Sequence, residues 1–461
     1  MKEEGSSVGV TEQLATFMVQ TGFEDITGEA INLTKQFFLD WLGVSLAGYK
    51  EEPGKIVTEY TREIGGTPES RLVGSGVFTS AANAAFANGT MGHILDFDDT
   101  GFSHPTGCIM PVLLALGEKL KSSGKEILTA HVMGYECFGK LSYGARPYER
   151  TLRMRGYHPS ATWGALAASA TAAKLLKLDV PKTRMAMGLA GSQAAGLTEN
   201  FGTMTKGSHS GNAARAGVLA ALLVQKGYTA SQEIIEGNHG LYHAIIGEGN
   251  YDLNRVTENL GKTWEIVTPG LAVKRYPSCG GNLRALDAIL GLVHEHHISF
   301  AEVESLEVEM SAQRRDTLRF EKPTNGYQGK FSMEYNMAAA ILDGKVDVDT
   351  FSEAKARSPE MREALGKVKV IVRDWGWEIG QKRMPVKVTM KDGRVYTNEV
   401  QKQRGHPENP ITKEELLAKY RYCAQRTKLP TDKIERSIEL AQNLETLNDI
   451  SGLMESVTEQ G

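Results

Sequence analysis

The chain has 461 residues, of which 41% are hydrophobic and 23% charged, the proportions of an ordinary globular protein. A chain of this length predicts two or three domains rather than one core. The formal net charge of -4 leaves room for a local basic patch but argues against a mainly basic surface, so we expect neither nucleic acid nor a membrane as partner.

The cysteines and the start of the chain indicate the compartment. The four cysteines are widely separated and form no CxxC pair, which argues against a zinc ribbon, a thioredoxin-type motif or an iron–sulfur cluster. The first ten residues, MKEEGSSVGV, lack the basic and apolar regions of a secretory signal. We therefore expect a cytoplasmic protein.

The first 270 residues are predicted to be almost entirely helical, because their apolar residues recur at helical spacing or lie in Ala-rich runs. A basic loop at 144–159 interrupts them. Small residues let helices approach closely, so this part is expected to be a tight bundle. The predicted helices are 10–19, 27–46, a run from a cap at Thr79, 111–120, 126–143, 160–178, 181–196 and 212–227.

Beyond residue 270 the pattern changes to alternating apolar and polar residues. Segments 305–310, 368–372 and 385–390 read as strands, and Asp392-Gly393 predicts a hairpin into 394–399. Helices are predicted between them at 283–294, 333–341 and 358–365, and again after Pro410 at 413–425 and 432–454. The predicted fold is mainly α: a helical domain from residues 1–270 and 405–461, with a smaller α+β domain inserted at 271–404.

The segment from Met91 to Gly107, MGHILDFDDTGFSHPTG, concentrates ionisable groups between two apolar helical stretches. A loop this acidic between core-forming helices predicts the wall of a functional site. The structural alternative is an acidic helix end in which Asp98 or Asp99 caps the following helix. His93 is expected to be a core or supporting residue that faces Asp96 at helical spacing.

Four further segments combine cationic or aromatic groups with Gly or Pro near a predicted helix start. Free N–H groups and the helix dipole make such places suited to anions, and a nearby lysine adds charge. Each signal is weak alone, since a lone lysine is usually solvated and a lone tyrosine usually lies in a core. Together they predict a substrate with several carboxylates or phosphates. The segments are 155–162, 200–209, 274–282 and 330–335.

A metal site is the competing interpretation of the acidic segment. His93, Asp96, Asp98 and His104 are acceptable ligands for a hydrolytic zinc or manganese ion. Their spacing matches no closed ligand motif such as HExxH, and no Walker or GxGxxG nucleotide motif occurs in the chain. We therefore expect neither metal nor nucleotide, with a metal-dependent hydrolase kept as an alternative together with a non-catalytic binding protein.

The motifs resemble the signature of the MmgE/PrpD family. They occur in the family's order over roughly residues 80–340, and the flanking helices extend the resemblance over nearly the whole chain. The matching residues are Leu95-Asp96-Phe97-Asp98-Asp99-Thr100, His104-Pro105-Thr106, Gly156-Tyr157-His158-Pro159, Gly202-Thr203-Met204-Thr205-Lys206, Lys274-Arg275-Tyr276-Pro277-Ser278-Cys279 and Phe331-Ser332 with Tyr335.

This family includes 2-methylcitrate dehydratases, cis-aconitate decarboxylases and iminodisuccinate epimerases. The resemblance implies a helical domain built from both chain ends, an inserted lid, a homodimer, and chemistry without metal or organic cofactor on a small carboxylate substrate. It places catalytic functions on Asp96, His104, His158, Lys206 and Tyr335. It places substrate contacts on Thr100, Lys206 and Lys274, and we expect Arg275, next to Lys274, to contact the substrate as well.

The implied reaction is proton transfer next to a carboxylate. His104 and His158 are expected to transfer the proton, Asp96 to orient one imidazole, and Lys206 to stabilise developing charge. A methylcitrate-type dehydratase is the leading expectation, with a cis-aconitate decarboxylase or an iminodisuccinate epimerase as alternatives. Two departures touch the pocket: the loop from Thr100 to His104 is shorter than in many members, and Asn282 and Leu283 stand where many have a histidine.

Overall fold

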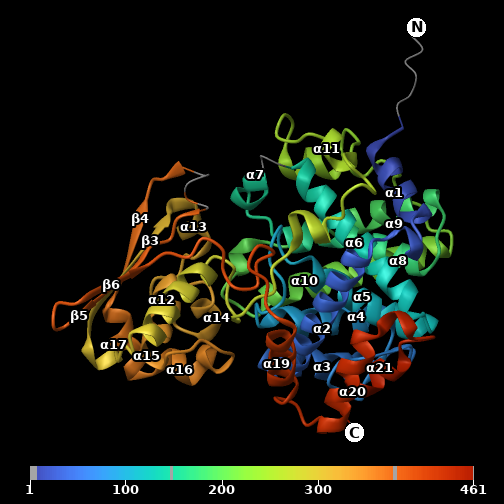
Figure 1. Cartoon of the computed structure of the whole chain (residues 1–461). Helices are drawn as coiled ribbons and strands as arrows, with labels where there is room; N and C mark the ends of the chain where they lie inside the picture. Colours follow the sequence, from blue (N-terminus) through green and yellow to red (C-terminus); the bar gives the residue numbers. More distant parts are fainter. Residues whose placement is uncertain (1–7, 146–148, 377–379, 381, 460–461) are drawn as a thin grey trace.

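The computed structural model describes residues 8–145, 149–376, 380 and 382–459. The fold is mainly α, with a smaller α+β part beside the helical part (Figure 1). Among the described residues, no helix is both long and apolar enough to cross a membrane.

The helical part begins at α1 and contains the predicted helices with shifted ends. Its α2 starts at the cap residue Thr27, whose side chain accepts a hydrogen bond from the backbone N–H of Ala30. The helices are α1 Val10–Gln20, α2 Gly28–Lys50, α3 Glu52–Ile64, α4 Ala81–Ile94, α5 Pro105–Leu120, α6 Gly124–Gly144, α7 Glu149–Met154, α8 Pro159–Leu175, α9 Val180–Gly191, α10 Thr205–Gln225 and α11 Asn254–Thr257. A short hairpin joins β1 (Ser70–Arg71) to β2 (Phe78–Thr79).

The α+β part contains a four-stranded sheet in the order β4-β3-β5-β6. Strand β3 pairs in parallel with β4 and antiparallel with β5, and the predicted Asp392-Gly393 turn joins β5 to β6. Helices α12 and α15 pack against the sheet (Figure 1). The elements are β3 Val303–Ser311, β4 Val368–Arg373, β5 Val386–Met390, β6 Val395–Asn398, α12 Leu283–Glu295, α13 Ala312–Thr317, α14 Gly326–Gly329, α15 Met333–Asp343, α16 Glu353–Arg357 and α17 Pro359–Gly366.

The C-terminal helices return to the helical part, where α19 packs on α2 (Figure 1). They are α19 Lys413–Ala424, α20 Thr431–Gln442 and α21 Ser451–Ser456. One large hydrophobic core accordingly combines residues 14–273 with residues 416–457, and a second core is built from residues 276–390.

A third, small core lies where these chain segments meet. It joins Val44 of α2, Leu95 and Phe97 beyond α4, Val348 from the α+β part and Cys423 of α19. Leu95 and Phe97 are thus buried on either side of Asp96 in the acidic segment. The packing of this junction fixes the backbone from which the candidate site is built.

Helices α4 and α10 cross at van der Waals contact because glycines face each other. A Cβ atom on Gly89 would lie 2.8 Å from the Cα of Gly211, and one on Gly207 would lie 2.9 Å from Ile94. This crossing brings the start of α10 against the end of α4. It therefore brings the segment around Lys206 to the acidic segment.

Several predicted boundaries were wrong, for identifiable reasons. Helix α10 begins at Thr205 rather than at 212, because packing on α4 stabilises a Gly- and Ser-rich turn with low helix propensity. Thr79 belongs to β2 and donates to the Gly65 carbonyl, so the residue at the cap of α4 is Ser80. The predicted helix 432–454 is two helices, α20 and α21, separated by residues 443–450. The basic loop, of which 146–148 lie outside the described residues, contains α7.

Candidate active site

The site is organised around Asp96, two residues beyond the end of α4. Its backbone is left-handed, with φ of 52°, which is unusual for a residue with a side chain. The neighbouring side chains of Leu95 and Phe97 are anchored in the junction core. The surrounding packing therefore holds Asp96 in a conformation that this segment would rarely adopt alone.

Two ammonium groups share the carboxylate of Asp96. Lys206 Nζ lies 3.2 Å from Asp96 Oδ1, and Lys274 Nζ donates to the same oxygen and, at 2.9 Å, to the Asp96 carbonyl. All three side chains are almost completely buried. Burial alone would raise the pKa of Asp96, but the two lysines hold it well below its usual value.

The two lysines differ in their own protonation equilibria. Burial lowers the pKa of Lys206, and Asp96 offsets this only in part. For Lys274 burial acts in the same direction, but Asp96 and Asp98 outweigh it and the pKa is raised. The difference agrees with geometry, since Lys274 bonds both the carboxylate and the carbonyl of Asp96. Lys206 is therefore the more available of the two for a substrate anion.

His104 and His158 both lie at this centre. His104 Nδ1 donates to the Asp99 carbonyl at 2.6 Å, which leaves its Nε2 as an acceptor in the neutral ring, 3.7 Å from Asp96 Oδ1. This distance is too long for a hydrogen bond, but a proton taken up by Nε2 would face the carboxylate of Asp96. The His158 ring centre lies 6.3 Å from that of His104, and its Nδ1 is 3.0 Å from Nδ1 of His209.

The imidazoles in this cluster are held uncharged. Burial first, and then the charges of Lys274 and Lys206, lower the pKa of His104 well below its ordinary value. Burial and Lys206 do the same to His158. Because the cations contribute to these shifts, a bound anion that neutralises Lys206 or Lys274 would raise the pKa of His104 again.

An aromatic wall and a hydroxyl complete the surroundings. Phe201 packs edge-on against His158 and stacks on Phe331 at 4.9 Å, so the wall combines the helical and the α+β parts. Thr100 exchanges backbone hydrogen bonds with Ala272, which ties the acidic segment to the segment of Lys274. A Cβ atom on Gly280 would lie 2.8 Å from the Thr100 hydroxyl oxygen, so glycine leaves that hydroxyl its space.

Two predicted residues lie apart from these contacts. The Tyr335 hydroxyl donates to the Thr350 carbonyl at 2.6 Å, and its ring belongs to the second core. The Arg275 side chain is about half exposed (53%) and lies 3.9 Å from Asp287. In an extended segment neighbouring side chains point to opposite faces, which agrees with Lys274 reaching Asp96 while Arg275 remains near solvent.

Two further side chains of the site have contacts that the sequence did not predict. His93 Nδ1 lies 2.7 Å from Asp98 Oδ2, and both side chains are fully buried, while the charge of Asp96 also acts on the His93 ring. Lys330, in one of the noted segments, donates to the carbonyls of Leu95 and Pro277, and burial lowers its pKa to about 7. Lys330 lies in one of the segments noted in the sequence, but no function was predicted for it. The His93–Asp98 contact crosses a turn, and helical periodicity does not predict contacts across a turn.

The acidic-cap interpretation also holds in part. Asp99 Oδ2 lies 3.5 Å from the backbone N–H of Thr106 in the first turn of α5. Burial, followed by the charge of Asp98, raises the pKa of Asp99 well above its usual value. Asp99 is therefore a structural residue of this segment.

Among the described residues, two clusters have the spacing of a metal site. One is His93, His104 and His158, and the other is Asp96, Asp98 and His104, each with ligand atoms within 4.8 Å of one another. In the second cluster the carboxylate of Asp96 already bonds two ammonium groups, which would repel a divalent cation. The charges around Asp96 thus suit an anionic ligand better than a metal.

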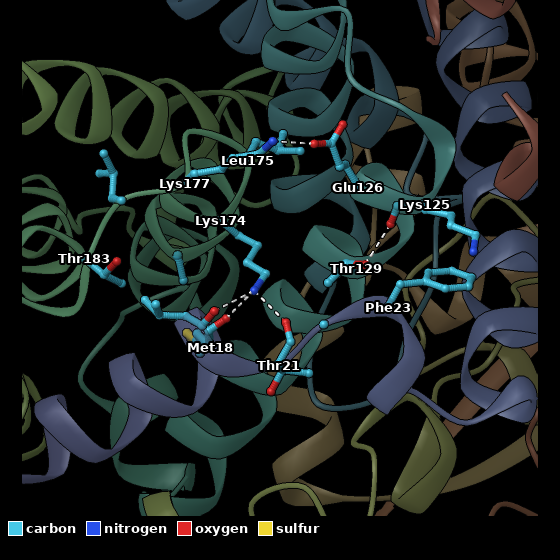
Figure 2. A pocket seen from close by; sticks show the side chains of 14 residues that line it. Met18, Thr21, Phe23, Lys125, Glu126, Thr129, Lys174, Leu175, Lys177 and Thr183 are labelled. Atoms are coloured by element: carbon cyan, nitrogen blue, oxygen red, sulfur yellow. Dashed lines mark hydrogen bonds and ion pairs between the residues drawn. The ribbon is translucent and has the colours of Figure 1, made fainter. Parts of the chain in front are cut away.

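A groove of about 700 Å³ is lined by Leu95, the neighbour of Asp96, and by Lys330, but by none of the predicted site residues. Its walls come from both parts of the molecule, including Thr203 before α10 and Phe351 after α15. A second cavity of about 350 Å³ contains none of the predicted site residues (Figure 2). There Lys174 donates to the carbonyls of Met18, Val19 and Thr21, so it caps the end of α1.

Comparison with known proteins agrees with the motifs. The family model of the MmgE/PrpD N-terminal domain matches residues 12–254, and that of the MmgE/PrpD C-terminal domain matches residues 276–446. The cis-aconitate decarboxylase of Homo sapiens is 30% identical, covering 96% of this chain and 93% of the relative. The cis-aconitate decarboxylase of Aspergillus terreus is 25% identical, covering 98% and 96%.

Proposed function

Since this chain belongs to the MmgE/PrpD family of lyases, we propose that it removes CO₂ from cis-aconitate or a closely related tricarboxylate without a cofactor. The observation that supports this most is the buried group of Asp96, Lys206 and Lys274 beside two uncharged imidazoles. The relatives that match over nearly the full length carry the name cis-aconitate decarboxylase, which favours decarboxylation over the dehydration expected from the motifs alone.

The reaction requires an anion site that also stabilises a carbanion. In the proposed mechanism Lys206 binds a substrate carboxylate, and Lys274 keeps Asp96 in place. The bond to the leaving carboxylate breaks, CO₂ departs, and the electron pair is delocalised into the unsaturated acid that remains. Preorganised cations that hold such charge are typically worth about 3 kcal/mol each.

Protonation of the resulting carbon ends the reaction. Substrate carboxylates near Lys206 and Lys274 counter the charges that lower the pKa of His104, so the imidazole takes up a proton when the substrate binds. His104 then donates that proton from Nε2, with Asp96 at 3.7 Å stabilising the cationic ring. His158 and Thr100 position the substrate, and the engaged hydroxyl of Tyr335 leaves it a structural function in this scheme.

The same residues would serve a dehydratase, in which one group removes an α-proton and another protonates the leaving hydroxyl. Product analysis by mass spectrometry distinguishes the outcomes on a panel of cis-aconitate, 2-methylcitrate, citrate and iminodisuccinate. Loss of CO₂ supports the proposal, and loss of water supports the dehydratase. An unchanged mass with altered optical rotation supports an epimerase, and no reaction with any acid contradicts a lyase of this class.

The broader organisation belongs to the same proposal. We propose that residues 1–270 and 405–461 form one domain, that 271–404 form an inserted lid, and that the protein is a cytoplasmic homodimer. The two large cores divide close to these ranges, with Leu271 and Val273 still in the first core, which supports the domain assignment. The position of the site residues at the junction of both parts supports a lid that covers the substrate.

A further inference from the structure

Asp96 is held by its backbone as well as by its carboxylate. Three consecutive carbonyl groups of the acidic segment each accept a hydrogen bond from a different lysine, at 2.8–2.9 Å. Lys274 and Lys330 are buried, and the side chain of Lys419 is 9% exposed. These lysines come from three separate parts of the chain. The pairs are Lys330 with Leu95, Lys274 with Asp96 and Lys419 with Phe97.

Lys419, on α19, contacts three different chain segments near the site, through Phe97, Lys274 and Asp40. Its ammonium group donates to the Phe97 carbonyl at 2.8 Å and to the Lys274 carbonyl at 2.9 Å, and it forms an ion pair with Asp40 Oδ1 at 2.6 Å. Two carbonyls and one carboxylate therefore surround this single cation. The nitrogen also lies 3.9 Å from the centre of the Phe97 ring.

Asp40 completes this arrangement from α2. It is 3% exposed, and burial raises its pKa although Lys419 opposes the shift. An aspartate in such a place is costly unless paired, and its described ion pair is with Lys419. Neither residue has a described bond to the carboxylate of Asp96, to His104 or to Lys206.

We propose that Lys419, held by Asp40, is a positioning residue that fixes the backbone of Asp96 and Lys274 for the proposed reaction. By bonding the Phe97 and Lys274 carbonyls together, it sets the distance between the two segments whose side chains form the Asp96–Lys274 pair. The strained φ of Asp96 makes this anchor necessary, because the segment could otherwise relax. The expected effect on turnover rests on the proposed function, whereas the expected effect on the geometry of Asp96 and Lys274 does not.

The test is the double substitution Lys419→Met with Asp40→Asn, which removes both charges and leaves no buried ion unpaired. The matched control is Lys140→Met with Glu265→Gln, a buried pair at 2.9 Å whose lysine donates to the Glu258 carbonyl. We expect turnover of cis-aconitate by folded K419M/D40N protein to fall about 100-fold, a loss that a 1 Å misplacement of a reacting group can cause. The control pair is expected to change thermal stability but not turnover.

A second readout does not depend on the substrate. The ring ¹⁵N signals of His104, assigned with His104→Gln, report the charges of Lys274 and Asp96 that face this imidazole. We expect them to move in K419M/D40N and to coincide with wild type in the control. If they move although no acid is turned over, the positioning stands and the proposed reaction fails.

Unchanged His104 signals in K419M/D40N overturn the inference, as does turnover within about threefold of wild type. If the double variant does not fold, Lys419→Arg replaces it, because arginine keeps a positive charge beside Asp40. Its planar guanidinium cannot bring donors to three acceptors around one point. The expected loss of turnover is then about tenfold, with the same change of the His104 signals.

Discussion

At the scale of single residues, the candidate site depends on one carboxylate that is shared by two buried ammonium groups. Lys206 is the ammonium group that has no second acceptor on Asp96, so it is the one best placed to bind substrate. Asp96 and Lys274, by contrast, bond each other through side chain and backbone. The different contacts of Lys206 and Lys274 lead to two predictions.

Replacing Lys206 by methionine should remove the cation that holds developing negative charge. We expect the turnover number to fall by about 100-fold or more, equivalent to about 3 kcal/mol of transition-state stabilisation. Steady-state kinetics on the identified acid measures this. Lys177→Met, which removes a surface lysine paired with Glu126, should leave turnover unchanged. Turnover of K206M within roughly threefold of wild type would show that Lys206 does not hold the developing charge.

Binding of an unreactive tricarboxylate such as tricarballylate should be coupled to proton uptake. The pKa of His104 is lowered in the free protein by burial and by Lys274 and Lys206, and carboxylates placed beside these lysines raise it. Calorimetric titrations near neutral pH in two buffers of different ionisation enthalpy give the number of protons taken up. His104→Gln should reduce that number. Proton release, or no exchange with buffer, would contradict the proposed proton donor.

The sequence identified most of this cluster, because Asp96, His104, His158, Lys206 and Lys274 each lie in a short segment with Gly or Pro. It did not identify Lys419, which lies on a helix that begins at the exposed Lys413 and carries no motif of the kind that marked the other residues. Only the tertiary structure shows its contacts near the site. The tertiary structure was also needed for Tyr335. Its motif matches the family and predicted a catalytic function, but its hydroxyl donates to the Thr350 carbonyl within the second core.

At the scale of elements, the contact of α4 and α10 sets the distance between Asp96 and Lys206. Gly211→Ala would place a Cβ atom 2.4 Å from the Phe86 carbonyl oxygen and force the helices apart. We expect a loss of about 1–3 kcal/mol in unfolding free energy, as for overpacked cores, together with lower turnover.

Urea denaturation and steady-state kinetics measure these two effects. Gly28→Ala is the matched control, because the added Cβ atom in α2 meets nothing within 4 Å. Alanine there should be neutral or stabilise the protein by up to about 1 kcal/mol. If G211A were as stable and active as G28A, the close helix contact would not determine the site geometry.

Helix positions followed from the sequence wherever apolar periodicity was strong, as for α2, α6, α12 and the strands of the sheet. The start of α10 did not, because Gly207 and Gly211 lower helix propensity in the sequence but are required by the close contact with α4. A residue that weakens a helix in isolation can therefore be the one that allows it to pack.

At the scale of the whole molecule, several buried histidines couple stability to pH. His131 is fully buried between Phe38 and Tyr135, and burial lowers its pKa to about 3 from 6.5. Between these values the unfolded chain binds a proton that the folded protein does not. The contribution of His131 to stability is therefore lost progressively as pH falls below 6.5, by about 1.4 kcal/mol per pH unit.

His131→Phe should remove this dependence while keeping an aromatic ring in place. We expect the difference in unfolding free energy between H131F and wild type to shift in favour of the variant as pH falls from 7 to 5. The comparison cancels groups of opposite sign, such as Glu136, whose pKa burial raises to about 8. Parallel curves for the two proteins would contradict the buried, neutral state of His131.

The two-part architecture was predictable at this scale, since the change from helical to alternating periodicity near residue 270 is sharp. The junction core of Val44, Leu95, Phe97, Val348 and Cys423 was not, because its members are far apart in sequence and each resembles ordinary core. That small core positions Asp96, so the sequence identified the residues of the site more readily than the packing that orients them.

The most direct test of the central claim is a proton NMR time course of metal-depleted protein with cis-aconitate in D₂O. A carbanion protonated by His104, which exchanges with solvent, predicts loss of CO₂ together with deuterium at one carbon of the product. This result should be obtained in the presence of EDTA. No reaction with EDTA, followed by reaction when zinc or manganese is restored, would contradict the account and assign the chemistry to a metal held by His93, His104 and their neighbours.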